Sequence, residues 1–565
     1  MSHTAQTLNK NNFLWIIPTT IIVLLPNIYL ILYGSEFTEF YLPGKVAYLS
    51  LFCFLFFLPF LFLRVRTFFI IQGIFVVLAP FEMGHIYLNK MPATSTFLLS
   101  IIDTNWNESI ELLLSIKIPL IGLFILWALY FFIVFKKIKN VYIIRSKKIR
   151  LYVAGIFLLI FIIGYAFFYL RERRTIANKK DAFQITNNYF WTNILHTYPY
   201  DLMIRTCQVY AIKNKIRNGK KKLQNFRFEA KKEDHLAARE VYVFVIGETG
   251  RYSNFSINGY QRETSPLLSK TPNLISYTDF FSEANITTSS LSLMLTRASV
   301  ADYSRSYVEK SFVDAFKEAG FKTYWIANQG AGNSFIRRIA KDTDSEYFAA
   351  FDFNASNNYD ERLWIPMEKV LEKNDEKVLI VLHTLGSHFR YNFRYPPSFE
   401  EFKPCLAGAF DYSFISAKNK TQFINTYDNS ILYTDYFLAN TIQKLDRLNC
   451  ISMLIYVADH GENLFDTDEN IVLHGGSKYT EYDFHVPFFV WTSNEYNFQY
   501  PSKRENLLRN KDKKLDTDNI FYSILDMAHI TFPEQELSKS IASDSLREDS
   551  IRYIINTNME VQRGY

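Results

Sequence analysis

The residue types that follow two apolar runs of this sequence suit the binding of a metal ion. Glu248 follows the run 241–246, and Asp459 and His460 follow the run 454–457. Aspartate and histidine are common zinc ligands, and glutamate supplies a further oxygen. A lone buried histidine is usually structural, whereas an Asp-His pair before a glycine at the end of a strand is less often so. We therefore predict a metal site formed by these three residues.

A hydroxyl-rich segment lies between these residues in the sequence. Residues 285–290 read NITTSS, and the apolar run 291–295 follows, which predicts a loop that enters a helix. Backbone N–H groups at a helix N-terminus can hold a phosphate, and a metal ion beside a hydroxyl lowers the pKa of that hydroxyl. The segment therefore holds either a nucleophile or ordinary N-cap residues, and the pattern alone does not separate the two.

Five short β-rich runs separated by helical stretches must position these side chains. They are residues 241–246, 323–326, 378–382, 454–457 and 488–491. Apolar strands that alternate with helices are typical of a parallel sheet with helices on both faces. Because sites form at the carboxyl ends of such strands, we predict an α/β domain over residues 241–565, with a mainly parallel sheet and the candidate residues at one edge.

The first third of the chain is apolar enough to cross a membrane several times. A membrane helix needs about 20 mainly apolar residues, and five segments approach that length: 13–33, 46–63, 68–88, 118–135 and 151–170. The first is too long for a removed signal peptide and lacks a small-residue cleavage site. We predict a transmembrane domain of five helices over residues 1–174, followed by a linker over residues 175–240.

Basic residues between these segments predict their orientation. Arg64 and Arg66 lie between the second and third segments, and seven Lys and Arg residues lie between positions 136 and 150. Short loops rich in Lys and Arg face the cytoplasm, so we expect the chain after residue 170 to lie outside it. The basic tract 213–232 in the linker is either a solvated surface or a contact for anionic lipid headgroups.

The composition excludes several classes of protein. The 565 residues include 62 Lys and Arg and 56 Asp and Glu, and a net charge of +6 does not indicate nucleic-acid binding. Aromatic residues make up 17% of the chain and charged residues 21%, which excludes a disordered chain. The four cysteines, Cys53, Cys207, Cys405 and Cys450, are too few for a disulfide scaffold. Whether Cys405 pairs with Cys450 stays open at this point.

Longer motifs around the candidate residues resemble those of the membrane-bound phosphoethanolamine transferases, within the alkaline phosphatase and sulfatase superfamily. The motifs are VIGETGRYSNFSINGYQRETSPLL at 245–268, LHTLGSHFRYNFRYPPSFEEFKP at 382–404, YVADHGENLFD at 456–466 and LHGG at 473–476. That family includes lipid A and core-oligosaccharide enzymes and the mobile colistin-resistance enzymes. Its architecture of five spans and an α/β domain is similar to the one predicted here.

The resemblance implies a role for each matched residue. The implied zinc ligands are Glu248, Thr287, Asp459 and His460. Thr287 is also the implied nucleophile, because it lies seven residues before Met294, and Thr288 competes with it. The implied catalytic histidines, which hold the phosphoryl group or a second metal and help proton transfer, are His388 and His474. The implied substrate-binding residues are Ser100, Thr104, Glu108, Asn328 and Glu462.

The resemblance also implies an activity. It is zinc-dependent transfer of phosphoethanolamine from phosphatidylethanolamine to lipid A or a core sugar of lipopolysaccharide, through a covalent threonine intermediate. The implied protein is a monomer in the inner membrane of a Gram-negative cell, with its catalytic domain in the periplasm and lipids as partners.

Two related enzymes and a non-catalytic membrane receptor are the alternatives. A phosphoglycerol transferase and a membrane sulfatase belong to the same superfamily, but the C/S-x-P-x-R motif that a sulfatase needs is absent around the nucleophile. A non-catalytic receptor would be expected to lose the metal ligands, which are present here.

Departures from the family pattern leave the acceptor open. The nucleophile loop contains no cysteine, unlike the loop of the colistin-resistance enzymes. Residues 325–333 lack the lysine of the lipid A enzymes and look closer to the core-oligosaccharide branch. One zinc ion is expected, a second is left open, and so is polymyxin resistance.

The predicted orientation can be tested with a reporter enzyme that is active only in the periplasm. Fused after Tyr565, the reporter should be active, because an odd number of spans carries that end out of the cytoplasm. The same reporter fused after Asn140, in the basic loop, should be inactive. The opposite pattern of activities would exclude the five-span topology.

Overall fold

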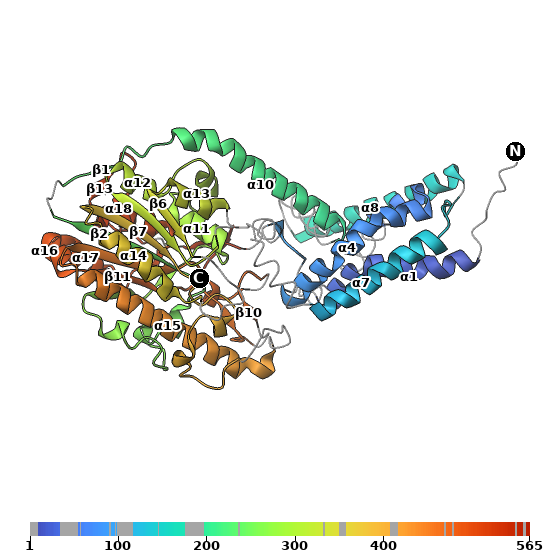
Figure 1. Cartoon of the computed structure of the whole chain (residues 1–565). Helices are drawn as coiled ribbons and strands as arrows, with labels where there is room; N and C mark the ends of the chain where they lie inside the picture. The colour runs from blue at the N-terminus through green and yellow to red at the C-terminus, as the bar shows by residue number, and fades with distance from the viewer. Residues whose placement is uncertain are drawn as a thin grey trace. The chain divides into compact units, whose positions relative to one another are not determined.

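A computed structural model divides the chain into two compact units, which are described separately (Figure 1). Unit 1 comprises Met1–Leu98 and Ile116–Ala211, and unit 2 comprises Leu99–Ser115 and Ile212–Tyr565. The structure describes residues 10–33, 55–56, 58–89, 92–95, 98, 117–144, 146–175, 197–234, 238–330, 334–349, 358–406, 416–467, 471–476, 479–548, 551–556 and 561–565.

Unit 1 contains long apolar helices. They are α1 (Lys10–Tyr33), α4 (Val65–Asn89), α7 (Lys117–Phe132), which continues as the π-helical turn η1 (Ile133–Lys137), and α8 (Lys147–Thr175). Among the described residues, two stretches are long and apolar enough to cross a membrane: Leu14–Leu32 and Val65–Ile86. Helices are thus confirmed at four of the five predicted positions. Most of 46–63 lies outside the described residues, and five membrane crossings remain a prediction.

One helix, α10 (Tyr200–Asn225), contains the boundary between the two units. It lies within the predicted linker and carries much of the basic tract, including Lys213 and Arg217. Residues 176–196 of the linker lie outside the described residues. The helix therefore accounts for residues 200–225 of the predicted linker.

The centre of unit 2 is a seven-stranded sheet with the order β3-β11-β8-β2-β7-β5-β6. Its strands are β2 (Glu240–Gly247), β3 (Leu274–Tyr277), β5 (Lys322–Ala327), β6 (Ser345–Phe348), β7 (Lys377–His383), β8 (Ile451–Ala458) and β11 (Phe488–Thr492). All five predicted strands are confirmed. The pairs formed by β8, β2, β7, β5 and β6 are parallel, as predicted.

The direction of β11 departs from the predicted parallel arrangement. This strand pairs antiparallel with both β8 and β3. A parallel neighbour needs a crossover that usually contains an α-helix. Between β8 and β11, the described residues contain only β9 (Asn463–Leu464), β10 (Val472–Leu473) and the 3-10 turn η11 (Glu481–Asp483). The chain returns in the opposite direction, and the sheet is mixed.

Both faces of the sheet are covered, as the apolar strands predict. Even-numbered side chains of β2 from 242 to 246 lie in one hydrophobic core, and odd-numbered ones from 241 to 245 lie in the other. The first core includes side chains of α11 (Thr287–Leu295), α12 (Phe312–Glu318) and α18 (Asp518–Met527), and the second those of α14 (Trp364–Leu371) and α15 (Lys420–Asp446). Each large buried side chain contributes roughly 1.5–3 kcal/mol, so these cores hold the strand ends in place.

Shorter elements complete unit 2. Two-stranded pairs form between β1 (Lys231–Lys232) and β13 (Ile530–Thr531), β4 (Phe280–Phe281) and β12 (Leu515–Asp516), β9 and β10, and β14 (Tyr553–Ile555) and β15 (Val561–Arg563). The remaining helices are α13 (Ser334–Asp342), α16 (Asn494–Gln499) and α17 (Pro501–Arg509). Strands of two residues are too short to show an alternating pattern in the sequence.

The cysteines that were candidates for a disulfide have separate partners. Cys405 Sγ donates to the carbonyl oxygen of Phe402 at 3.0 Å, and Cys450 Sγ lies 3.3 Å from Ser452 Oγ. Cys207, Cys405 and Cys450 are all free thiols. Cys405 and Cys450 therefore do not form a disulfide bond in this structure.

The turn after β7 packs directly on the backbone of Glu248. The amide of Ser387 donates to the Glu248 carbonyl oxygen at 3.0 Å. Gly386 has a φ of 47°, and a Cβ on it would lie 2.7 Å from the same oxygen and 2.9 Å from the Glu248 nitrogen. The absence of a side chain at Gly386 therefore permits this close approach.

Gly386→Ala is expected to destabilise the chain more than Gly320→Ala. Both glycines have positive φ, so alanine at either position costs about 1 kcal/mol of conformational strain. At Gly320 a Cβ would meet nothing within 4 Å, whereas at Gly386 it would overlap backbone atoms. Thermal unfolding of the detergent-solubilised chain measures the difference. Equal melting temperatures for the two variants would contradict the close packing.

Candidate functional site

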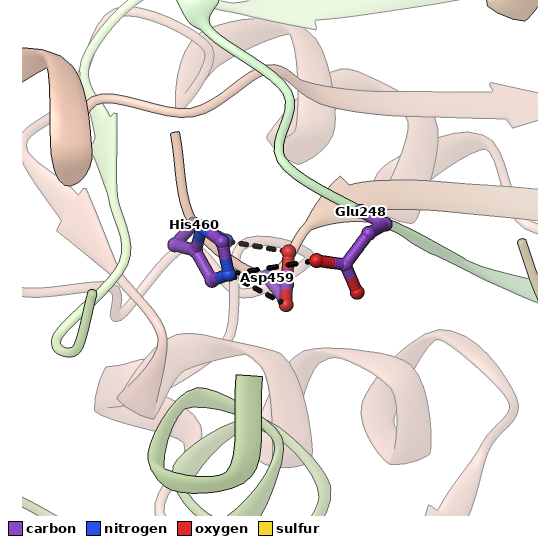
Figure 2. Close-up of side chains that lie close together, drawn as sticks. All are labelled: Glu248, Asp459 and His460. Carbon is purple, nitrogen blue, oxygen red and sulfur yellow. Dashed lines mark hydrogen bonds and ion pairs between the residues drawn. The ribbon is translucent and has the colours of Figure 1, made fainter. Parts of the chain in front are cut away.

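Glu248, Asp459 and His460 lie together at the ends of two neighbouring parallel strands (Figure 2). Gly247 of β2 is paired with Ala458 of β8, so the residues that follow them leave the sheet side by side. One ligand atom from each lies within 4.8 Å of the others. His460 Nε2 is 3.3 Å from Asp459 Oδ2 and 3.5 Å from Glu248 Oε1. The predicted proximity of these three residues is confirmed.

Thr249 holds both carboxylates of the cluster in place. Its hydroxyl donates to Glu248 Oε1 at 2.9 Å, and its backbone N–H donates to Asp459 Oδ1 at 3.0 Å. Thr249 has a φ of 58°, a conformation that is uncommon for a β-branched residue. This strain is consistent with a functional site, because strained residues persist where the surrounding structure fixes them.

The electrostatics of the cluster favour a bound cation. Burial and the charge of Glu248 raise the pKa of Asp459 to about 7. Burial also acts to raise the pKa of Glu248, but His388 and His460 outweigh it and hold that pKa at about 2. Asp459 Oδ2 is buried and accepts no hydrogen bond from the residues that the structure describes. A positive ion would be a suitable partner for this oxygen.

The donor set of the cluster suits zinc. His460 Nδ1 lies 2.9 Å from the Gly461 carbonyl oxygen, which leaves Nε2 to face the carboxylates. A ligating histidine commonly uses its other nitrogen in this way. Two carboxylates and an imidazole match the oxygen and nitrogen ligands of catalytic zinc sites, which also keep a position open. The residues present therefore fit the metal that the sequence predicts.

Thr287 borders the cluster from the first position of α11. Its hydroxyl oxygen lies 3.3 Å from His460 Nε2 and 3.5 Å from Glu248 Oε1. The helix is tied to Asp459, since the hydroxyls of Ser282 and Ser290 both donate to the Asp459 carbonyl oxygen at 2.5 Å. A hydroxyl, a candidate metal site and the N-terminus of a nine-residue helix thus meet at one point.

A second group of titratable residues lies next to the cluster. His474 Nδ1 is 3.1 Å from Glu462 Oε1, and Tyr391 donates to Glu462 Oε2 at 2.9 Å. The rings of His474 and His460 have centroids 3.9 Å apart. Burial raises the pKa of Glu462 to about 8 and lowers that of His474. His388, the other predicted catalytic histidine, is exposed.

Of the five predicted substrate-binding residues, the structure describes Asn328 and Glu462. Asn328 is fully buried, and its amide donates to Asp360 Oδ1 at 2.9 Å and to the Asn358 carbonyl oxygen at 3.0 Å. These contacts show that the amide holds the turn at 358–360, and substrate binding by Asn328 stays a prediction. Both oxygens of buried Glu462 are already engaged. Ser100, Thr104 and Glu108 lie outside the described residues.

Four supporting residues were missed in the sequence analysis: Thr249, Gln329, Asp360 and Tyr391. Asp360 accepts hydrogen bonds from the backbone N–H groups of Leu385 and Gly386 and so holds the turn after β7. Thr249 follows Glu248 directly, and this position next to a candidate ligand could have identified it as a supporting residue. The others lie far from the ligands in sequence, and no spacing connects them.

Unit 2 is an α/β domain with a candidate metal site at the carboxyl ends of its parallel strands, where ligands bind in such sheets. The sequence model of the family described as Sulfatase matches residues 240–530. Since the match covers more than half of the chain, the chain belongs to the Sulfatase family.

Curated relatives confirm the more specific resemblance. The chain is 28% identical over 345 residues to phosphoethanolamine transferase EptC of Escherichia coli (strain K12), a match over 59% of this chain and 57% of EptC. It is 34% identical over 281 residues to the Kdo(2)-lipid A phosphoethanolamine 7''-transferase of the same strain, over 47% of each chain. The chain spans about half the length of the relatives that it matches.

Solved structures support the same relationship. The C-terminal periplasmic domain of E. coli EptC, solved in complex with Zn, superposes with a TM-score of 0.53 at 27% identity, covering 58% of this chain and 92% of that domain. The integral membrane protein lipooligosaccharide phosphoethanolamine transferase A of Neisseria meningitidis superposes with a TM-score of 0.71 at 20% identity, covering 94% of this chain and 98% of that chain. The second likeness shows that the similarity of fold extends over nearly the whole chain.

Asp459→Asn is expected to lower zinc affinity by at least about tenfold. Asparagine keeps an acceptor for the two backbone N–H groups at Oδ1 but lacks the charge at Oδ2. The measurement is zinc content by elemental analysis after dialysis against a weak chelator. Asp435→Asn is the control, because Asp435 accepts the N–H groups of Leu267 and Leu268 and is not part of the cluster. Full zinc occupancy in Asp459→Asn would exclude the assignment.

Proposed function

We propose that the chain transfers phosphoethanolamine from phosphatidylethanolamine to a lipopolysaccharide acceptor through a covalent intermediate on Thr287. The observation that carries the proposal is the position of the Thr287 hydroxyl, 3.3 Å from His460 Nε2 and 3.5 Å from Glu248 Oε1. The names of the curated relatives support the same activity. Zinc as the cofactor is supported by the cluster and by the relative solved with Zn.

Glu248, Asp459, His460 and Thr287 would hold the zinc ion. When bound, zinc supplies Lewis acidity, which favours the deprotonated form of a nearby hydroxyl and offsets negative charge on a phosphoryl oxygen. α11 begins at Thr287, and backbone N–H groups at the N-terminus of a helix suit a phosphate. They would orient the phosphoryl group for attack.

The reaction proceeds in two displacements at phosphorus. Thr287 Oγ1 forms a bond to the phosphorus of the donor as the bond from phosphorus to the diacylglycerol oxygen breaks. An acceptor oxygen then attacks the same phosphorus, and the bond to Thr287 breaks. His474, oriented by Glu462, and His388 carry the proton from each attacking oxygen to each leaving oxygen. Atoms and charge balance over the two steps.

The wider setting follows from the lipid nature of both substrates. The donor and the lipopolysaccharide acceptor are held in a membrane, so the proposed location is the Gram-negative inner membrane with unit 2 in the periplasm. A monomer suffices, because the cluster uses residues of one chain. The proposed acceptor is either lipid A or a core sugar of lipopolysaccharide.

Thr287→Ala should abolish the covalent intermediate, whereas Thr288→Ala should retain it. Removing Thr287 Oγ1 eliminates the nucleophile, and we expect a loss of several orders of magnitude in diacylglycerol release from fluorescent phosphatidylethanolamine. Intact-protein mass spectrometry detects the added phosphoethanolamine. An adduct on Thr287→Ala but not on Thr288→Ala would move the nucleophile to Thr288. An adduct formed only with phosphatidylglycerol would indicate the phosphoglycerol transferase alternative.

The acceptor is identified by mass spectrometry of lipopolysaccharide from cells with and without the chain. We expect one added phosphoethanolamine, on lipid A or on a core sugar, that disappears with Thr287→Ala. Unmodified lipopolysaccharide in cells where the chain releases diacylglycerol would exclude this acceptor class.

A further inference from the structure

Gln329 contacts the cluster, although it is not among the predicted ligands or catalytic residues. Its Nε2 donates to Glu248 Oε2 at 2.8 Å and to the Thr384 carbonyl oxygen at 2.9 Å. We infer that Gln329 is a positioning residue that fixes the Glu248 carboxylate for metal binding. The inference rests on the proposed metal site.

The two oxygens of Glu248 are held by different neighbours. Oε2 accepts from Gln329, and Oε1 accepts from the Thr249 hydroxyl at 2.9 Å. Oε1 is also the oxygen that faces His460 Nε2 and the Thr287 hydroxyl. With a donor on each oxygen, the carboxylate plane cannot rotate, and Oε1 keeps its direction toward the cluster.

The chemistry of the amide suits this position. Both neighbours of Nε2 are acceptors, so the side chain must present its NH₂ group and uses both hydrogens. A hydrogen bond to an ionised carboxylate is stronger than one between neutral groups. Glu248 is only 2% exposed, so water competes weakly for its oxygens. A side chain without a donor would leave Glu248 Oε2 and the Thr384 carbonyl oxygen with one partner fewer each.

The backbone that carries Gln329 is itself fixed. Gln329 lies two residues beyond the end of β5, and the preceding residue donates its N–H to the His383 carbonyl oxygen at 2.9 Å. The side chain of that residue, Asn328, is anchored on Asp360. The buried Asn328 therefore has a role in this arrangement, since it holds the turn from which Gln329 reaches Glu248.

The role of Gln329 differs from that of a ligand. A residue that orients a ligand typically changes metal affinity by about tenfold to a hundredfold when it is removed. The chain should remain folded, because Gln329 is only partly buried. The geometry of the bound metal should change as well, because the freed carboxylate can rotate.

The test compares Gln329→Met and Gln329→Asn with the wild-type full-length chain in detergent. Methionine preserves length and removes the donor, and asparagine keeps an amide that is one methylene too short to reach Glu248. Zn²⁺ affinity is measured by competition with a chromophoric chelator, and the visible absorption bands of the Co²⁺-loaded chain report ligand geometry. We expect affinity lower by about tenfold to a hundredfold and altered Co²⁺ bands in both variants.

The control is Gln535→Met, the same change at a partly buried glutamine that donates to the Ile530 carbonyl oxygen and contacts no residue of the cluster. Unchanged affinity and bands in both Gln329 variants would overturn the inference, as would an equal loss in Gln535→Met. Loss of affinity with unchanged Co²⁺ bands would also overturn it. A wild-type chain that binds no Zn²⁺ would instead refute the proposed metal site.

Discussion

Glu248 and Asp459 are two carboxylates buried side by side, and the residues around them are arranged to hold this pair. Charges of like sign repel strongly in a buried site, because little solvent screens them. Burial and this repulsion by Glu248 together raise the pKa of Asp459. A divalent cation reverses the effect, since it lets both carboxylates be ionised. The neutral donors Thr249 and Gln329 hold the pair without competing for the cation.

The register of the strands sets the positions of Glu248 and Asp459. β2 is hydrogen-bonded to β7 on one side and to β8 on the other, and the backbone pairing continues beyond the strand ends. Asp459 N donates to the Gly247 carbonyl oxygen and Thr384 N to the Ile246 carbonyl oxygen, at 3.0 and 3.1 Å. A shift of one residue would turn every side chain of a strand to the other face. The two cores therefore fix the site as well as the fold.

This dependence on register explains what the sequence predicts well. The strands are continuous apolar runs, and each candidate ligand directly follows one, so their meeting at one edge could be predicted from order alone. The direction of β11 could not, because it depends on how the segment between β8 and β11 folds back. The predicted number of membrane spans rests on the apolar composition of five segments. The structure has helices at four of these positions.

The supporting residues could not be predicted, for a different physical reason. Gln329 and Asp360 act through hydrogen bonds between turns that are distant in the sequence, and turn conformation carries no periodic signal. Asn328 is an example: it adjoins Gln329 in a loop of polar residues, and only the structure shows that its amide donates to Asp360 and Asn358. Side-chain direction within a turn is set by its anchors, which the residue order does not reveal.

The hydrogen bonds around α11 link the fold to the proposed two-step transfer. Asp459 contributes a carboxylate to the cluster through its side chain, and its carbonyl oxygen accepts the hydroxyls of Ser282 and Ser290. The segment that carries Thr287 is thus tied to a candidate ligand of the same cluster. A covalent intermediate must meet two different partners at one fixed phosphorus, and small displacements of reacting atoms lower rates strongly. Holding Thr287 and Asp459 together would keep that position constant in the proposed transfer.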